Sequence, residues 1–120
     1  MREEKELQRI IELARREVNR QNSPLALQYL LETKADVEMC EGTRLSAEHQ
    51  LTLAETLASM RDREARSIAP AGFEEAITRI CNLPERVPEL ELRAHEHLAS
   101  FSRLNAFVLS LGPITRPQRK

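Results

Sequence analysis

Two histidines near the C-terminal end, His95 and His97, could bind a metal, because imidazole nitrogens are common metal ligands. A helix turns by about 100° per residue, so side chains two positions apart point about 200° from each other. A helix that carries both residues cannot chelate one ion with them. Glu91 lies four positions before His95 and can share its face, but one carboxylate and one imidazole are too few ligands for a metal centre. We therefore expect no metal and no other cofactor.

Cys40, His49 and Cys81 carry the groups of a thiol nucleophile and its base. Such a site needs a thiolate held near the base and a third group that orients the base. Nothing in the spacing brings these residues together. Each cysteine has apolar neighbours at helical spacing, which is typical of a small buried side chain. We therefore interpret both thiols as structural.

Two pairs of acids, Glu74 with Glu75 and Glu89 with Glu91, could serve in acid–base catalysis only if both carboxylates of a pair faced one cleft. Both pairs stand instead at the predicted starts of helices, where negative charge complements the helix dipole. The chain contains no nucleotide loop and no other catalytic motif. We predict that the protein is not an enzyme.

The composition indicates which elements position these residues. The chain has 120 residues, enough for one domain with its own core, and it is rich in Leu, Ala, Glu and Arg, which favour helices. Aromatic residues make up 3 % of the chain, and the runs of Val, Ile and Thr that would fill strands are missing. We expect an all-α fold.

Charge and cysteine content indicate the compartment and the class of partner. The formal net charge of -1 gives no field that would attract nucleic acid or a membrane surface. The first residues, MREEKELQ, are charged where a secretory signal peptide is apolar, and no run approaches the ~18 apolar residues of a membrane span. A secreted scaffold of this size would carry more cysteines. These features predict a cytoplasmic protein with no membrane partner.

Apolar residues at helical spacing, together with capping residues and prolines, predict a compact bundle of about five helices. The predicted helices cover residues 3–21, 24–42, 46–66, 73–81 and 88–111. Ser46 is expected to cap the third helix, and residues 67–73, which contain a proline and a glycine, are expected to form a loop. Residues 1–112 are predicted to form a single helical domain, followed by a flexible basic tail over 113–120. We see no internal repeat.

The stretch LTLAETLASMRDREARSI, residues 51–68, resembles the helix-turn-helix of DNA-binding regulators in its Leu-Ala-Glu-x-Leu opening and in the arginines that follow. Where that motif has a glycine turn, this chain has Ala58 and Ser59, and the apolar position of the second helix falls near Glu64. One continuous helix is therefore the simpler interpretation.

A nucleic-acid-binding regulator is the alternative function that these arginines suggest. It would use the predicted helix and the basic tail, through Arg61, Arg63, Arg66, Arg116, Arg119 and Lys120. Asp62 and Glu64 alternate with the helix arginines and nearly cancel their field, whereas a phosphate footprint requires a patch of one sign. Nucleic acid is therefore the second choice of partner.

Two segments are apolar on almost every side, residues 25–31 and residues 104–111. A helix of this kind is either central in its own fold or covered by another chain, and a bundle of this size has room for about one central helix. The other helix should expose an apolar patch, which usually marks a binding surface. The residues predicted to contact a partner are Leu104, Phe107, Val108, Leu111, Leu25 and Tyr29. We therefore expect a non-enzymatic protein–protein interaction module, a homo-oligomer, small subunit or adaptor, that binds through the apolar face of its C-terminal helix.

Overall fold

The structure, a computed structural model, describes residues 3–40 and 42–97. These residues form five helices and no strand. The helices are α1 (Glu4–Asn19), α2 (Ser23–Glu38), α3 (Arg44–Ala58), α4 (Arg63–Cys81) and a helix from residue 88 to residue 97, the last residue described. The predicted all-α bundle of about five helices is confirmed. Residues 98–111 of the last predicted helix and the predicted tail over 113–120 lie outside the described residues.

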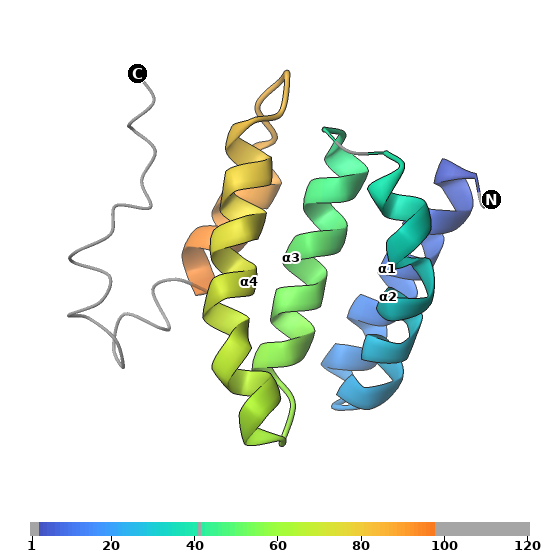
Figure 1. The fold of residues 1–120 in the computed structure, drawn as a ribbon, viewed down its shortest axis with the longest axis vertical. Coiled ribbons are helices and arrows are strands. Elements are labelled where there is room, and N and C mark those ends of the chain that lie inside the picture. The colour runs from blue at the N-terminus through green and yellow to red at the C-terminus, as the bar shows by residue number, and fades with distance from the viewer. Residues whose placement is uncertain (1–2, 41, 98–120) are drawn as a thin grey trace.

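The helices form two hairpins that pack side by side, with helix 88–97 against the second hairpin (Figure 1). A tight turn joins α1 to α2, and another joins α3 to α4. In the view of Figure 1, α1 lies behind α2, and helix 88–97 lies behind α4. α3 contacts α1, α2 and α4 and lies in the middle of the molecule. Side chains on this central helix can therefore face both hairpins.

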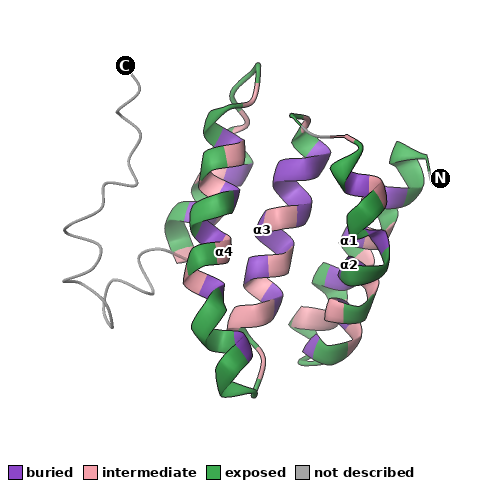
Figure 2. Ribbon diagram, viewed as in Figure 1, coloured by how far each residue is buried: buried purple, intermediate pink, exposed green. Residues whose placement is uncertain are grey.

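Two clusters of buried apolar side chains hold the helices together. The first core joins α1, α2 and the start of α3, and it consists of Leu7, Ile11, Ala14, Ala26, Leu30, Val37 and Leu45. The second core joins α3, α4 and helix 88–97, and it consists of Ala47, Leu51, Ala54, Ala69, Phe73, Ala76, Ile80, Leu90 and Ala94. Most residues of α3 are buried or half-buried, as Figure 2 shows. Each hairpin therefore has its own core, and α3 supplies side chains to both.

The buried positions recur between the two hairpins, although the residue types differ. α3 and α4 begin 40 residues after α1 and α2, respectively. The first helix of each hairpin has three buried residues that are four and then three positions apart. They are Leu7, Ile11 and Ala14 in α1, and Ala47, Leu51 and Ala54 in α3. The second helix of each hairpin has four buried residues that are four, three and four positions apart. They are Ala26, Leu30, Thr33 and Val37 in α2, and Ala69, Phe73, Ala76 and Ile80 in α4. The spacing of the buried positions thus recurs between the two hairpins, and this recurrence is hidden in the sequence because different side chains fill the positions.

The start of α3 differs from the prediction. Thr43, and not Ser46, is the N-cap, because the Thr43 side chain accepts a hydrogen bond from the backbone N–H of Ser46 at 3.3 Å. Ser46 is buried in the first turn, and its Oγ accepts a hydrogen bond from the Arg79 guanidinium at 3.1 Å. The residue predicted to cap the helix therefore ties the start of α3 to the end of α4.

The predicted continuous helix over residues 46–66 is wrong, because the chain turns after Ala58 and α4 begins at Arg63. Asp62 caps α4 by accepting a hydrogen bond from the backbone N–H of Glu64 at 3.2 Å. A capping carboxylate satisfies an N–H that has no partner inside the helix, and it thereby favours a new helix start. The polar run thus forms a turn and the first turn of α4.

Side chains fasten the turn between α3 and α4. The guanidinium of Arg66 donates to the carbonyl oxygens of Met60 and Arg61, at 3.1 and 2.6 Å. The Oγ atoms of Ser59 and Ser23 lie 2.6 Å apart and share a hydrogen bond. The second contact connects this turn to the start of α2, so the two hairpins are linked at their turns.

The predicted loop over residues 67–73 is also wrong, because these residues lie inside α4. A proline in a helix interior removes a backbone hydrogen bond and costs about 3 kcal/mol or more, so Pro70 by itself favours a break. Ala69 and Phe73, on either side of the proline, are both fully buried in the second core. The burial of this side of α4 outweighs the cost of the proline.

Gly72 also has a role that its type alone does not indicate. A Cβ atom at this position would lie 3.2 Å from the Cβ of Ala54 on α3, which is closer than most such contacts. The carbonyl of Gly72 accepts a hydrogen bond from Nε2 of Gln50 at 3.1 Å. The glycine therefore permits a close approach of α3 and α4.

Two residues with positive φ shape the connections before α3. Gln21 has φ 65° and follows the C-cap of α1, where its N–H donates to the Val18 carbonyl at 2.9 Å. The N–H of Asn22 donates to the Glu17 carbonyl at 2.7 Å, which completes the usual left-handed helix ending. Gly42 has φ 86° and lies in the connection between α2 and α3. Glycine adopts this conformation freely, whereas glutamine pays a steric cost for it.

Candidate functional site

Three helices share one face of the molecule: α1, α3 and helix 88–97. A pocket of about 360 Å³ opens on this face. It is lined by Arg15, Val18, Asn19, Glu55, Ala58, Ser59, Arg93, Glu96 and His97. The lining draws on three segments that are far apart in the sequence, so only the tertiary fold creates it.

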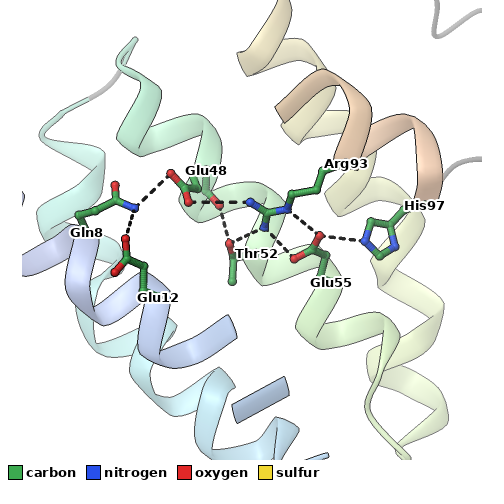
Figure 3. Close-up of polar contacts among 7 residues, drawn as sticks. All are labelled: Gln8, Glu12, Glu48, Thr52, Glu55, Arg93 and His97. Atoms are coloured by element: carbon green, nitrogen blue, oxygen red, sulfur yellow. Dashed lines mark hydrogen bonds and ion pairs between the residues drawn. The ribbon is translucent and has the colours of Figure 1, made fainter. Parts of the chain in front are cut away.

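An ion pair between Arg93 and Glu55 connects helix 88–97 to α3 (Figure 3). Nη2 of Arg93 donates to Oε1 of Glu55 at 2.8 Å, and Nε donates to Oε2 at 3.1 Å. This two-point contact is the geometry in which a guanidinium binds a carboxylate most strongly. The two side chains are only 15 % and 13 % exposed. Water and salt therefore screen this pair much less than a surface pair.

The surroundings of Glu55 keep its carboxyl group ionised. Burial by itself would raise the pKa of Glu55, because burial disfavours the charged form. Hydrogen bonds from His97 and Arg93, together with the positive charge of Arg93, outweigh burial and lower the pKa from its ordinary value of 4.5 to about 2. Glu55 is therefore a carboxylate at neutral pH.

Further polar contacts extend from Arg93 across α3 to α1. Nη2 of Arg93 also donates to Oγ1 of Thr52 at 3.1 Å, and Nη1 lies 3.8 Å from Oε2 of Glu48. Thr52 donates to the backbone carbonyl of Glu48 at 2.8 Å. Nε2 of Gln8 donates to Glu48 at 3.3 Å and to Glu12 at 3.4 Å. As Figure 3 shows, this network spans all three helices of the face, and it fixes their relative positions.

His97 connects the network to the second core. Its Nε2 lies 2.8 Å from Oε2 of Glu55, and its ring stacks on Phe73 with centroids 4.9 Å apart and an interplanar angle of 23°. Phe73 is fully buried, whereas His95 on the same helix is exposed. The two imidazoles therefore have different surroundings, as their spacing predicts.

Glu55 and His97 form a carboxylate–imidazole pair, but a hydrolytic centre also needs a nucleophile bonded to the imidazole. The hydroxyl in the pocket lining belongs to Ser59, and it donates to the carbonyl of Thr56 at 2.9 Å. Among residues 3–40 and 42–97, no group of three His, Cys, Asp or Glu residues could hold a metal ion. The pocket thus offers charges and hydrogen-bonding groups for binding.

Two residues of the possible thiol site, His49 and Cys40, have other partners. His49 is buried on α3, and its Nε2 lies 3.0 Å from the carbonyl of Leu30 on α2. A carbonyl only accepts, so this nitrogen carries a proton, and burial lowers the pKa of His49 below its ordinary value. Cys40 is half-buried against the first core. The predicted burial of Cys81 is wrong, because this residue is exposed at the end of α4. The contacts of His49 therefore make it a link between α2 and α3.

The residues predicted to contact a partner fall partly on α2. Leu25 and Tyr29 are half-buried, and Tyr29 packs against the first core. The other four, Leu104, Phe107, Val108 and Leu111, lie outside the described residues. The described residues therefore bear only on the α2 part of the predicted surface.

The residues predicted to contact nucleic acid fall partly on the turn between α3 and α4 and on the first turn of α4. Arg61, Arg63 and Arg66 are all exposed there, and Arg66 also binds carbonyls of the turn. The other three, Arg116, Arg119 and Lys120, lie outside the described residues. The three described arginines are therefore brought together at one end of the second hairpin.

The sequence interpretation missed the network around Arg93. One signal was present, because Glu48, Thr52 and Glu55 repeat the spacing of four and three that is typical of a buried stripe. In α3 they come directly after the buried apolar residues Ala47, Leu51 and Ala54, respectively. Polar residues at core spacing on a helix predict a buried polar network, although they do not identify its partner.

Comparison of the chain with protein-family models, with curated proteins and with solved structures finds no match. In residues 3–40 and 42–97, no helix is long and apolar enough to cross a membrane. The interpretation of the site therefore rests on its own geometry.

Proposed function

We propose that this protein is a non-enzymatic interaction module that binds another protein through the face formed by α1, α3 and helix 88–97. The network centred on Arg93 carries this proposal, because it holds three helices in one arrangement around the pocket. A surface that is fixed before binding loses little conformational entropy when a ligand docks. Stacked helical hairpins commonly bind partners on a surface to which several hairpins contribute.

The lining of the pocket favours a peptide segment as the ligand. Arg15 and Asn19 are exposed one turn apart on α1, and Glu96 is exposed on helix 88–97. The amide of Asn19 both donates and accepts hydrogen bonds, which matches the groups of a peptide backbone. Arg15 offers the ligand a positive charge, and Glu96 offers it a negative charge. Val18 and Ala58 are half-buried and offer apolar contact to a small side chain.

Selection from a displayed library of random peptides tests this proposal. Peptides enriched on the wild-type protein should bind the Arg15→Glu variant more weakly, by about tenfold or 1.4 kcal/mol, because the charge at the pocket is reversed. Arg16→Glu is the matched control, since Arg16 is also exposed on α1 but does not line the pocket. Equal losses in the two variants, or no enriched peptide, would count against this face.

The apolar segment over residues 104–111 is a second proposed contact for the partner, supported by its sequence pattern. If the segment is an interface, Phe107→Glu should remove partner binding and leave the helical circular dichroism signal intact. If Phe107 belongs to the core of its own chain, the same substitution should unfold the protein. Light scattering of the purified wild-type protein would show whether the partner is a second copy.

Nucleic acid is the alternative ligand, and the exposed end of the second hairpin, which gathers Arg61, Arg63 and Arg66, supports it. Asp62 and Glu64 lie at the same end, and they reduce its positive field. Binding to nucleic acid should weaken steeply with salt, whereas apolar association should persist or strengthen. A fluorescent oligonucleotide titrated at low and high salt distinguishes the two ligand classes.

We also propose a cytoplasmic location. Cys40 and Cys81 are both free thiols, and Cys81 is exposed. A reducing compartment would keep an exposed thiol from oxidation.

A further inference from the structure

One side of α2 presents an apolar stripe to solvent. The α2 stripe consists of Leu27, Leu31, Ala35 and Met39, spaced four residues apart, with Met39 at the C-cap. Leu31 is 54 % exposed and Met39 is 71 % exposed. Ala35 is also exposed, and Leu27 is half-buried. Burial of these side chains in an interface would release free energy in proportion to the apolar area covered.

The other helix of the same hairpin differs in this respect. The exposed residues of α1 include Arg9, Glu12 and Arg16, which are charged. Both helices turn one side to solvent, and both pack on the first core with the other side. The solvent side of α1 is thus charged, as is usual for an exposed surface, whereas the solvent side of α2 carries the apolar residues of the α2 stripe.

We infer that the α2 stripe binds the α2 stripe of a second copy of this chain, in a twofold pair whose α2 helices run in the same direction. Residues spaced four apart form a ridge, and two such ridges pack with the helix axes about 50° apart. Along the ridge, one small residue, Ala35, lies between two large ones, Leu31 and Met39. A leucine of one copy can therefore occupy the space beside an alanine of the other.

Charges beside the α2 stripe select the second copy as the partner and set its direction. At about 100° per residue, Glu32 lies about 80° to one side of the centre of the stripe, and Lys34 lies about 80° to the other side. Glu38 is on the same side as Lys34, about 40° from the centre, and it lies six residues along the helix from the level of Glu32. In a twofold pair of parallel helices, each flank faces the opposite flank of the other copy. Glu32 of one copy then lies across from Lys34 of the other, and symmetry forms this contact twice. An antiparallel pair would bring the Glu32 flanks together, with like charges facing each other.

The predicted dimer is weak and depends on concentration. Stable complexes bury about 800 Å² on each partner, and one pair of crossing helices covers less than this. The Lys34 side chain is 52 % exposed and lies 4.0 Å from Glu38 of its own helix, so the contact with the second copy competes with solvent and with this pair. α2 contributes no residue to the pocket, so the dimer does not depend on the proposed function.

Sedimentation velocity from about 1 µM to about 1 mM measures this association. The wild-type protein should change from monomer to dimer within this range, and Leu31→Glu should raise the dissociation constant more than about tenfold, because a charge would be buried in the interface. Leu92→Glu is the matched control, since Leu92 is 61 % exposed on helix 88–97. This variant should associate as the wild type does. A wild-type protein that stays monomeric throughout, or equal effects of the two substitutions, would overturn the inference.

Charge reversal tests the direction of the pair. Glu32→Lys and Lys34→Glu should each weaken the dimer several-fold, because each brings like charges together across the interface. The double variant should restore the wild-type dissociation constant, since the opposite charges face each other again. Single variants that associate like the wild type, or a double variant weaker than both, would overturn the parallel arrangement.

Discussion

The two cores of this protein hold equivalent hairpins together with different side chains. The first core has large aliphatic residues, such as Leu7 and Leu30, at most of its buried positions. The second core places alanines at most of its positions around a single aromatic residue, Phe73. Small residues let helices approach closely, and they leave little side-chain volume to fill a gap. The second core therefore fills more of its volume with one side chain, that of Phe73, than the first core does.

Each core also has a polar link across α3, and the two links differ in charge. On the side of the first core, neutral His49 donates to the carbonyl of Leu30. On the side of the second core, ionised Glu55 pairs with Arg93. Both links weaken in acid, but in different ranges of pH. Substitutions and pH can therefore separate the contributions of the two halves.

The largest expected effect is that of Phe73→Ala. Removal of a buried phenylalanine costs about 3–5 kcal/mol, and the alanines around Phe73 cannot expand into the cavity. Leu30→Ala is the matched substitution at the equivalent position of the first core, with an expected cost of about 2–5 kcal/mol. Urea unfolding measures both costs. A smaller loss for Phe73→Ala than for Leu30→Ala would contradict the comparison.

The Glu55 carboxylate should give a stability that is lost only in strong acid. Its pKa in the folded protein is about 2, below the ordinary value of 4.5, so its contribution is complete above pH 4.5 and disappears as the pH falls towards 2. The full contribution amounts to about 3 kcal/mol. Glu55→Gln should lose about this amount at neutral pH and flatten the pH dependence in that range.

The control for this substitution is Glu12→Gln, which removes an exposed carboxylate of α1 at the other end of the network. It should change the free energy of unfolding by less than about 0.5 kcal/mol. Urea unfolding between pH 7 and about pH 2.5 gives both profiles and covers most of the decline expected between pH 4.5 and pH 2. An unchanged profile in Glu55→Gln would show that the ion pair does not stabilise the second half.

The His49 link should weaken in milder acid. Because its pKa is lowered in the folded protein, stability is complete above the ordinary value of 6.5 and falls as the pH drops below it. His49→Gln keeps a hydrogen-bond donor for the Leu30 carbonyl but cannot take up a proton, so it should cost about 1 kcal/mol at neutral pH and flatten the profile below pH 6.5. A profile that keeps its slope in this variant would assign the titration to another group.

The smallest effects concern the two positive-φ residues. Gln21→Gly should stabilise the protein by about 0.5 kcal/mol, because glycine adopts the left-handed conformation without a steric cost. Gly42→Ala should destabilise it by about 1 kcal/mol for the converse reason, since a Cβ at Gly42 has no atom within 4 Å and only the backbone is strained. Thermal unfolding compares the two variants, and effects of the same sign would contradict this account.

The helices themselves could be predicted because their signal is local. Leu7, Ile11 and Ala14 show the helical spacing within α1, and all three lie on the buried side of this helix. The break after Ala58 could not be predicted as reliably, since Asp62 serves equally well on a helix surface and as a cap. Local patterns therefore identified the type of element more securely than its ends.

The site could not be predicted because its members are distant in sequence. Arg93 and Glu55 are 38 positions apart, and nothing near either residue indicates the other. Pro70 and Gly72 were misinterpreted for the same reason, because the packing that keeps them helical comes from α3. Their local preference for a loop was correct, but it was the weaker effect.

The sequence by itself determined the all-α class, since backbone hydrogen bonds and apolar spacing within a few residues decide whether a segment is helical. Only the tertiary structure decided where α3 ends, that α4 continues through Pro70, and that Arg93 meets Glu55 beside a pocket. These features depend on the free energy of contacts between helices. That free energy is set by which side chains the fold brings together, and no short stretch of the chain contains that information.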